Sequence, residues 1–169
     1  MHYIQQHTPL YISTDGSRNH KKSEDGWIIS LTDGTEIISG WNPDFGQITV
    51  ISLYHSEIYA FLASLTILEC YCDYSYLQLL NPIEVFCDNK YYVVKYNELQ
   101  SNAYSKLFMN KLKEHEAHLA LLKIIPKHFT LSHVKGHQDA LKTLDELTIP
   151  ERLNYRADIF SQRVKPNHR

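Results

Sequence analysis

Four acidic residues occupy positions at the ends of expected strands or on expected helices. They are Asp15, Glu57, Asp88 and Asp158. If the fold gathers them, each pair of charges about 4 Å apart repels by roughly 4 kcal/mol at an effective dielectric of about 20. Such a cluster persists when carboxyls are protonated or cations bind, and Mg²⁺ or Mn²⁺ suits a set of oxygen ligands. Two such ions stabilise the attacking and the leaving oxygen of a phosphoryl displacement.

Each of these acids also has an ordinary structural interpretation. Asp15 and Gly16 form a dipeptide that is typical of turns. The other three acids are equally compatible with helix caps, turns or solvated faces. The catalytic interpretation therefore depends on all four acids lying where one site can collect them.

The first part of the chain predicts three antiparallel strands. Leu10–Thr14 is β-prone, and a polar stretch from Arg18 to Asp25 separates it from the apolar run Trp27–Leu31. Asp33-Gly34 then precedes a third run at Thr35–Trp41, and two apolar runs around Asp-Gly favour a hairpin. We expect Asp15 to end the first strand and the segment from Asn42 to Ile51 to be a loop.

The middle of the chain predicts a crossover that brings two of the acids together. Ser52 is a suitable N-cap for a helix that reaches about Cys72, with apolar residues at helical spacing. Ile83–Cys87 has few polar residues and is typical of a strand that is buried on both faces. A right-handed crossover places this strand parallel to the first, so that Asp15 and Asp88 emerge at one edge of the sheet.

The remaining sequence predicts two helices, a strand and a last helix. We expect helices at Asn89–Glu98 and Ser101–Leu122, a strand at His128–Val134, a loop at Lys135–Thr148 and a helix at Pro150–Val164. Together these elements predict one α/β domain that spans residues 1–169. Its core covers about residues 9–164, with loosely held termini, and its mixed sheet is packed with helices.

The composition excludes several classes of protein. The chain has 169 residues and a formal net charge of −2, without the strongly basic balance of a protein that wraps nucleic acid. Three cysteines without framework spacing indicate reduced thiols in an intracellular protein. No apolar run approaches the length that spans a membrane, and we see no secretory signal.

Five short motifs occur in an order that resembles the ribonuclease H family, type 1. They are TDGS at Asp15, SEIYA at Glu57, CDN at Asp88, HVKGHQD at His137 and NYRAD at Asp158. The resemblance extends from about Pro9 to Val164, and VKGHQD followed by a long loop resembles the RNase H domains of retroelement reverse transcriptases. It implies a five-stranded mixed sheet with strands 1-2-3 antiparallel, strands 1-4-5 parallel and helices on both faces.

The resemblance also implies a mechanism and roles for the acidic residues. It implies a metal-dependent endonuclease that cuts the RNA strand of RNA–DNA hybrids with two Mg²⁺ ions, for which Mn²⁺ substitutes, and leaves 5′-phosphate and 3′-hydroxyl products. Asp15 would contact both ions, Glu57 and Asp88 would complete one metal site, and Asp158 would complete the other. His137 would transfer a proton or assist product release, although a solvated loop histidine explains it too.

Further residues match positions near the substrate in that family. They are Gly16, Ser17, Asn89 and Asn154. Asn154 shares a helix face with Asp158 and is matched to a contact with an RNA 2′-hydroxyl or a phosphate. Asp139 could assist the metal site, but turn chemistry in GHQD explains it equally well.

The sequence departs from the family at two sets of binding positions. Leu53 and Tyr54 replace an Asn-Asn pair that contacts the minor groove in many members, and the helical stretch Ala103–Glu116 carries few cations. We therefore expect the isolated domain to bind hybrid weakly and with strong salt dependence. Tethering to a reverse transcriptase would raise the effective concentration of hybrid at the site. We also expect the isolated domain to be a monomer. Two alternatives stay open, a catalytically silent binding module and a related DNA nuclease.

Overall fold

The computed structural model describes residues 4–5, 8–19, 22–42, 53–80, 83–101 and 129–162. Its five strands form one sheet in the order β3-β2-β1-β4-β5. The strands are β1 (Leu10–Asn19), β2 (Lys22–Leu31), β3 (Glu36–Asn42), β4 (Ile83–Cys87) and β5 (Phe129–His133). β1 pairs antiparallel to β2 and parallel to β4, which confirms the expected mixed sheet.

The first two strands are longer than the sequence indicates. The segment expected to be a polar connection belongs to a ladder that runs from Leu10 opposite Leu31 to Asn19 opposite Lys22. The prediction that Asp15 ends the first strand in a turn is therefore wrong, since Asp15 pairs with Gly26 within the ladder. Backbone hydrogen bonds between two neighbouring strands hold this polar extension, and they need no apolar side chains.

The parallel part of the sheet stops just before the acidic residues. The β1–β4 register ends with Thr14 opposite Cys87, and β4 ends at Cys87 as predicted. Asp15 and Asp88 are therefore the next residues on two adjacent parallel strands. Their common position at one edge follows from the register.

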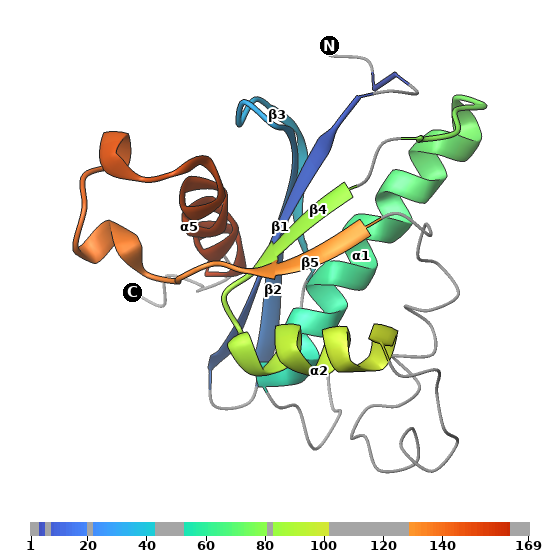
Figure 1. Cartoon of the computed structure of the whole chain (residues 1–169). Helices are drawn as coiled ribbons and strands as arrows, with labels where there is room; N and C mark the ends of the chain where they lie inside the picture. The colour runs from blue at the N-terminus through green and yellow to red at the C-terminus, as the bar shows by residue number, and fades with distance from the viewer. Residues whose placement is uncertain are drawn as a thin grey trace, which may run out of the picture.

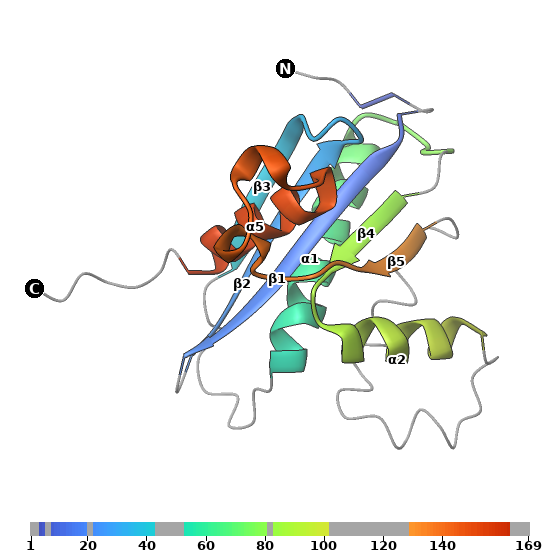
Figure 2. The ribbon, with the colours of Figure 1, turned by 60° about the vertical axis from the view of Figure 1, so that its left-hand side comes forward.

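The described helices cover both faces of the sheet (Figures 1 and 2). α1 (Leu53–Tyr74) and α2 (Lys90–Ser101) lie on one face, and α5 (Ile149–Ser161) lies across the other. α1 packs against β1 and β2 as the crossover between the antiparallel strands and β4. Two short 3₁₀ turns, η1 (Gln138–Ala140) and η2 (Leu144–Glu146), lie in the connection between β5 and α5.

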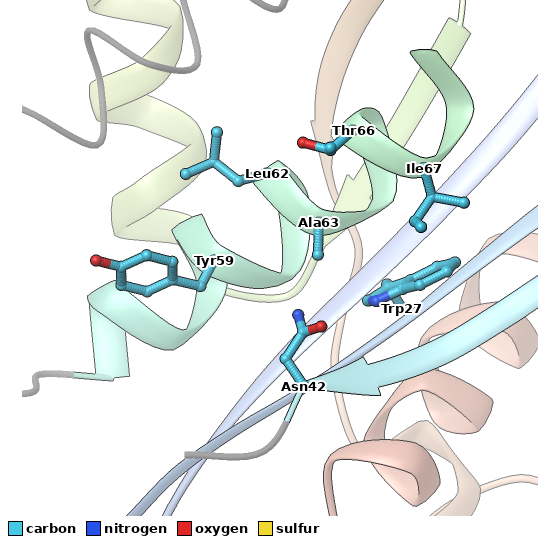
Figure 3. Close-up of a pocket in the computed structure, with 7 residues that line it drawn as sticks. All are labelled: Trp27, Asn42, Tyr59, Leu62, Ala63, Thr66 and Ile67. Carbon is cyan, nitrogen blue, oxygen red and sulfur yellow. The ribbon is translucent and has the colours of Figure 1, made fainter. Parts of the chain in front are cut away.

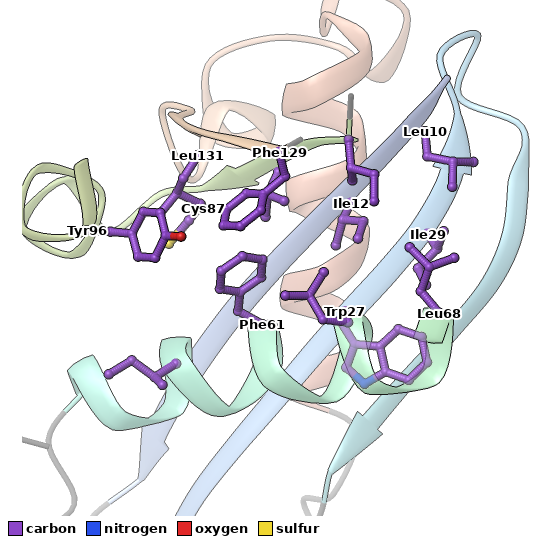
Figure 4. Packing of buried hydrophobic residues seen from close by; sticks show 14 of the residues in the cluster. Leu10, Ile12, Trp27, Ile29, Phe61, Leu68, Cys87, Tyr96, Phe129 and Leu131 are labelled. Carbon is purple, nitrogen blue, oxygen red and sulfur yellow. The ribbon is translucent and has the colours of Figure 1, made fainter. Parts of the chain in front are cut away.

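The core lies between α1, α2 and the sheet. In Figure 4, Phe61 projects from α1 toward Phe129 and Tyr96, and its ring centroid lies 5.3 Å from that of Phe129 and 6.1 Å from that of Tyr96. Ile12 and Val85 are fully buried in adjacent strands of the same core. This packing fixes the position of α1 relative to the ends of β1 and β4.

The predicted helices agree with the structure at their starts and differ at their ends. The last helix begins at Ile149, where the side chain of Thr148 accepts a hydrogen bond from the backbone N–H of Glu151, and it ends at Ser161 rather than near Val164. α2 extends to Ser101, beyond the expected end at Glu98. The expected helix at Ser101–Leu122, except its first residue, and the expected loop after Asn42 lie outside the described residues. No helix among the described residues is long and apolar enough to span a membrane.

Candidate active site

Four elements bring the four predicted carboxylates to the edge where β4 ends. β1 carries Asp15, the residue after β4 is Asp88, and α1 and α5 carry the other two acids from opposite faces of the sheet. Each of Asp15, Glu57 and Asp88 has a raised pKa to which at least one other carboxylate contributes. The structure therefore places the four acids within electrostatic reach of one another.

Two glycines allow the helices to approach the sheet closely at this point. A Cβ atom on Gly16 would lie 2.7 Å from the backbone nitrogen of Glu57, and a Cβ on Gly26 would lie 2.2 Å from the carbonyl oxygen of Ala157. α1 and α5 therefore contact the backbone of β1 and β2 directly. Gly16 lies against the first turns of α1, and its approach to substrate stays a prediction.

Asp15 is almost completely buried, with 5% of its surface exposed. Burial, followed by repulsion from Asp88 and Asp158, raises the pKa of Asp15 to about 7. The hydroxyl of Ser161 donates a hydrogen bond to Oδ2 of Asp15 at 2.8 Å and opposes this shift. The ionised form of Asp15 is therefore costly unless positive charge lies nearby.

Glu57 is also buried, and a cysteine thiol contacts its carboxylate. Burial and then the charges of Asp15 and Asp88 raise the pKa of Glu57 well above its usual value. The thiol of Cys87 donates to Oε2 of Glu57 at 3.3 Å, and Cys87 itself is fully buried at the end of β4. Ligand atoms of Glu57, Cys87 and Asp88 all lie within 4.8 Å of one another.

Asp88 is only partly buried and faces the loop that carries the predicted histidine. Burial raises its pKa, while the charge of His137 lowers it. His137 is exposed and adopts a left-handed backbone conformation with φ of 53° before η1. A Cβ on Gly136 would lie 2.2 Å from Oδ2 of Asp88, so the loop backbone passes directly beside this carboxylate. The structure therefore brings His137 to the carboxylate cluster.

Asp158 and Asn154 lie on the face of α5 that meets the sheet. Oδ1 of Asp158 accepts a hydrogen bond from the side chain of Gln162 at 2.6 Å, and Asp158 is partly buried. The amide of Asn154 donates to the carbonyl oxygen of Thr14 at 3.5 Å, and this asparagine is 2% exposed. Asn154 thus helps to dock α5 on β1, and a contact with substrate stays a prediction.

The other predicted site residues have more limited descriptions. Oδ1 of Asn89 accepts a hydrogen bond from the backbone N–H of Tyr92, which makes Asn89 the cap of α2. Ser17 continues β1 opposite Glu24, and Asp139 is exposed in η1. Their roles toward substrate or metal stay predictions.

The chemistry of this donor set fits hard divalent cations. Most of the donors are carboxylate oxygens, three of the four carboxyls have raised pKa values, and a dication would relieve their mutual repulsion. Cys87 adds one soft donor beside Glu57. The oxygen set is typical of Mg²⁺ or Mn²⁺ ligation.

A separate cavity of about 460 Å³ lies between α1 and the β2–β3 pair (Figure 3). It is lined by Trp27, Asn42, Tyr59, Leu62, Ala63, Thr66 and Ile67. None of the four carboxylates lines it. Trp27, which lines the cavity from β2, is buried, whereas Trp41 is 43% exposed.

The structure adds site residues that the sequence did not indicate. Ser161 and Cys87 each donate to one of the four carboxyls, and neither belongs to a residue pattern that announces this contact. The one available signal is their location, since Cys87 precedes Asp88 and Ser161 lies one helical turn after Asp158. Asp25, a buried carboxyl that accepts a hydrogen bond from Asn42 at 2.6 Å, was also not expected.

Solved structures with the same fold include ribonucleases H and a viral protease-reverse transcriptase. LC11-RNase H1, solved in complex with an RNA/DNA hybrid, has 16% identity and a TM-score of 0.57, and the match covers 89% of this chain and 92% of that protein. RNase H1 from the archaeon Halobacterium salinarum has 17% identity and a TM-score of 0.55, with 90% and 94% covered. No family model and no curated protein matches the sequence.

A foamy viral protease-reverse transcriptase in complex with an RNA/DNA hybrid aligns with 95% of this chain at 14% identity and a TM-score of 0.61. The match covers 20% of that longer protein. At these identities the likeness concerns the fold. The sheet order, the parallel β1-β4-β5 unit and the helices on both faces agree with these neighbours, and the chain has the RNase H fold.

Proposed function

We propose that this protein is a metal-dependent endonuclease that cuts the RNA strand of RNA–DNA hybrids. The observation that carries the proposal is the convergence of four carboxylates at the end of β4, where burial and then at least one neighbouring carboxylate raise the pKa values of Asp15, Glu57 and Asp88. A fold gains no stability from such repulsion, and a purely structural role does not account for it. The neighbouring RNase H structures share the fold and support the assignment.

In this proposal Asp15, Glu57, Asp88 and Asp158 hold two Mg²⁺ ions, with Mn²⁺ as a substitute. When bound, the ions supply an activated water and neutralise charge on the leaving 3′-oxygen. The carboxylates would hold the ions in place. The nearly complete burial of Asp15 and Glu57 excludes water and strengthens the attraction between these carboxylates and the ions. The products carry 5′-phosphate and 3′-hydroxyl ends.

His137 acts as the proton-transfer group in this proposal. It is exposed, it follows a glycine that passes directly beside Asp88, and its charge acts on Asp88. An imidazole that titrates near neutral pH suits the removal of a proton or the release of product. Gly16, Ser17, Asn89 and Asn154 stay proposed substrate-binding residues.

We further propose that the chain acts as a single RNase H domain of retroelement type, inside the cell and as a monomer. The alignment of this chain with a fifth of a viral protease-reverse transcriptase supports the retroelement type, because the aligned portion there is part of a longer reverse transcriptase protein. Tethering to such a module would raise the effective concentration of hybrid at the site. The fold by itself does not specify the activity, because one fold hosts many functions.

The test is cleavage of end-labelled RNA–DNA hybrids in Mg²⁺ and in Mn²⁺. We expect the native chain to cut the RNA strand and Asp88→Asn to be at least about 100-fold slower, because the substitution removes a ligand charge while it keeps the shape. Asp145→Asn, an exposed acid in η2, serves as the matched control and retains activity. Thermal unfolding shows that both variants fold.

A substrate panel separates this activity from the two alternatives. Duplex DNA cut faster than hybrid would indicate a DNA nuclease. Hybrid binding with equal inactivity of the native chain and Asp88→Asn, over several hybrids and both metals, would indicate a silent binding module. Cleavage of hybrid RNA that leaves 5′-phosphate ends, and that stops when the metal is chelated, supports the proposal.

A further inference from the structure

Ser161 connects α5 to β1 at the carboxylate cluster. It is the last residue of α5 and fully buried, and its hydroxyl donates to Oδ2 of Asp15 at 2.8 Å. The same oxygen lies 2.9 Å from the carbonyl oxygen of Asp158, one turn earlier in the helix. One side chain therefore contacts one acid of the site and the backbone of another.

The two contacts compete for a single proton. A hydroxyl has one hydrogen to donate, and both Oδ2 of Asp15 and the carbonyl of Asp158 are acceptors. A serine inside a helix ordinarily donates to the carbonyl three or four residues earlier. Here the second acceptor is a carboxylate, and hydrogen bonds to ionised acceptors are about twice as strong as neutral ones. The proton is therefore directed to Asp15 when Asp15 is ionised.

The contact determines which oxygens of Asp15 remain for other ligands. Ser161 holds Oδ2 of Asp15, and the backbone of Asp15 is paired opposite Gly26 in the ladder. The Asp15 side chain is therefore held at its carboxyl oxygen and at its backbone. The close contact between α5 and Gly26 maintains this distance, because the backbone of Ser161 itself would lie 2.7 Å from a Cβ at that position. The arrangement is rigid, as expected of a group that orients a ligand.

We propose that Ser161 is a positioning residue that holds the carboxylate of Asp15 for metal binding. This inference rests on the proposed function for its catalytic consequence, whereas its effect on metal affinity is independent of turnover. Ser161 touches neither metal nor substrate in this proposal. It acts through Asp15.

The chain offers a matched control for the ordinary structural role of a buried serine. Ser64 in α1 is also fully buried, and its hydroxyl donates to the carbonyl oxygen of Phe61, three residues earlier, at 2.8 Å. It has the helical contact of Ser161 without the carboxylate. A comparison of Ser161→Ala with Ser64→Ala therefore isolates the contact with Asp15.

The experiment measures Mn²⁺ binding by electron paramagnetic resonance of the free ion, together with kcat and KM on a hybrid. We expect Ser161→Ala to weaken Mn²⁺ binding by about tenfold or more and to lower kcat by a similar factor, with KM for the hybrid little changed. Ser64→Ala should match the native protein in all three quantities. Ser161→Thr, which keeps the hydroxyl, should recover most of the Mn²⁺ affinity.

The outcomes distinguish this inference from the proposed function. Native Mn²⁺ affinity in Ser161→Ala, equal losses in Ser161→Ala and Ser64→Ala, or a native chain that binds no Mn²⁺ would overturn the role of Ser161. If the native chain binds Mn²⁺ without cutting any hybrid, the proposed nuclease fails, and the loss of affinity in Ser161→Ala still supports the positioning role. Thermal unfolding of each variant confirms that the fold is retained.

Discussion

At the scale of single residues, the site consists of acids that are expensive to ionise. Asp15 and Glu57 are buried. The hydroxyl of Ser161 donates a hydrogen bond to Asp15, and the thiol of Cys87 and the backbone N–H of Gly16 donate to Glu57, but these donors are uncharged. No Lys or Arg among the described residues forms an ion pair with either acid. Positive charge must therefore come from outside the described side chains when these acids ionise.

Replacement of Asp15 by asparagine separates stability from activity. The side chain keeps its shape and an oxygen acceptor for Ser161, but it loses a charge that the buried site opposes. We expect Asp15→Asn to abolish hybrid cleavage and to raise the free energy of unfolding without metal at pH 8 by roughly 1–3 kcal/mol. Urea denaturation at pH 8 in a chelator measures the second effect. A less stable Asp15→Asn protein would show that the charge of Asp15 is compensated.

At the scale of elements, glycines determine how closely the helices and the loop approach the carboxylates. A side chain at Gly26 would meet the backbone of α5, whereas one at Gly136 would meet the carboxylate of Asp88. The backbone of α5 cannot move without shifting the helix, whereas the carboxylate of Asp88 can rotate. A substitution at Gly26 therefore tests the packing of α5, and one at Gly136 tests the orientation of Asp88.

Alanine substitutions at these two glycines should have opposite consequences. Gly26→Ala should destabilise the protein by about 1–3 kcal/mol or more, because α5 has to move away from β2. Gly136→Ala should change stability little and slow cleavage by at least about tenfold, because the carboxylate of Asp88 has to turn. Thermal unfolding and hybrid cleavage, measured on both variants, check the contrast. Equal losses of stability in the two would contradict it.

The elements also show which features of the fold the sequence predicts and which it does not. β4 is predicted with its observed bounds, because a short apolar run between a proline and an acidic residue leaves few alternatives. The lengths of β1 and β2 are missed, because a polar ladder is held by backbone hydrogen bonds that leave no hydrophobic period. The contact between Ser161 and Asp15 joins residues 146 positions apart, and such pairs are visible only after the fold is known.

At the scale of the whole molecule, buried acids such as Asp15 and Asp25 link folding to pH. Burial raises the pKa of Asp15 and of Asp25 to about 7, well above their value of 3.8 in an unfolded chain. In this range the folded state binds more protons than the unfolded state. Their contribution to stability is therefore fully present below pH 4 and decreases as the pH rises toward and through 7.

The metal-free protein should therefore lose stability as the pH rises from 4 to 8, and Mg²⁺ should reduce that loss. We expect Asp15→Asn and Asp25→Asn each to flatten the profile, whereas Mg²⁺ should compensate only the part due to the carboxylate cluster. The distinction arises because Asp25 is held by Asn42 and its pKa shift involves none of the four acids. Denaturation midpoints at several pH values, with and without Mg²⁺, measure both effects. A metal-free profile that rises over this range would contradict the sign.

The hydrogen bond between Ser161 and Asp15 also has a consequence for the order in which the protein folds. β1 lies near the start of the described residues and α5 near their end, so this contact joins residues that are far apart in the sequence and closes a long loop. During synthesis, β1, β2 and α1 emerge before α5, and the surface of the sheet that α5 covers stays exposed until α5 has emerged. The four acids can therefore come together only after α5 has packed, and a ribosome-bound fragment that lacks α5 also lacks Asp158 and an assembled carboxylate cluster.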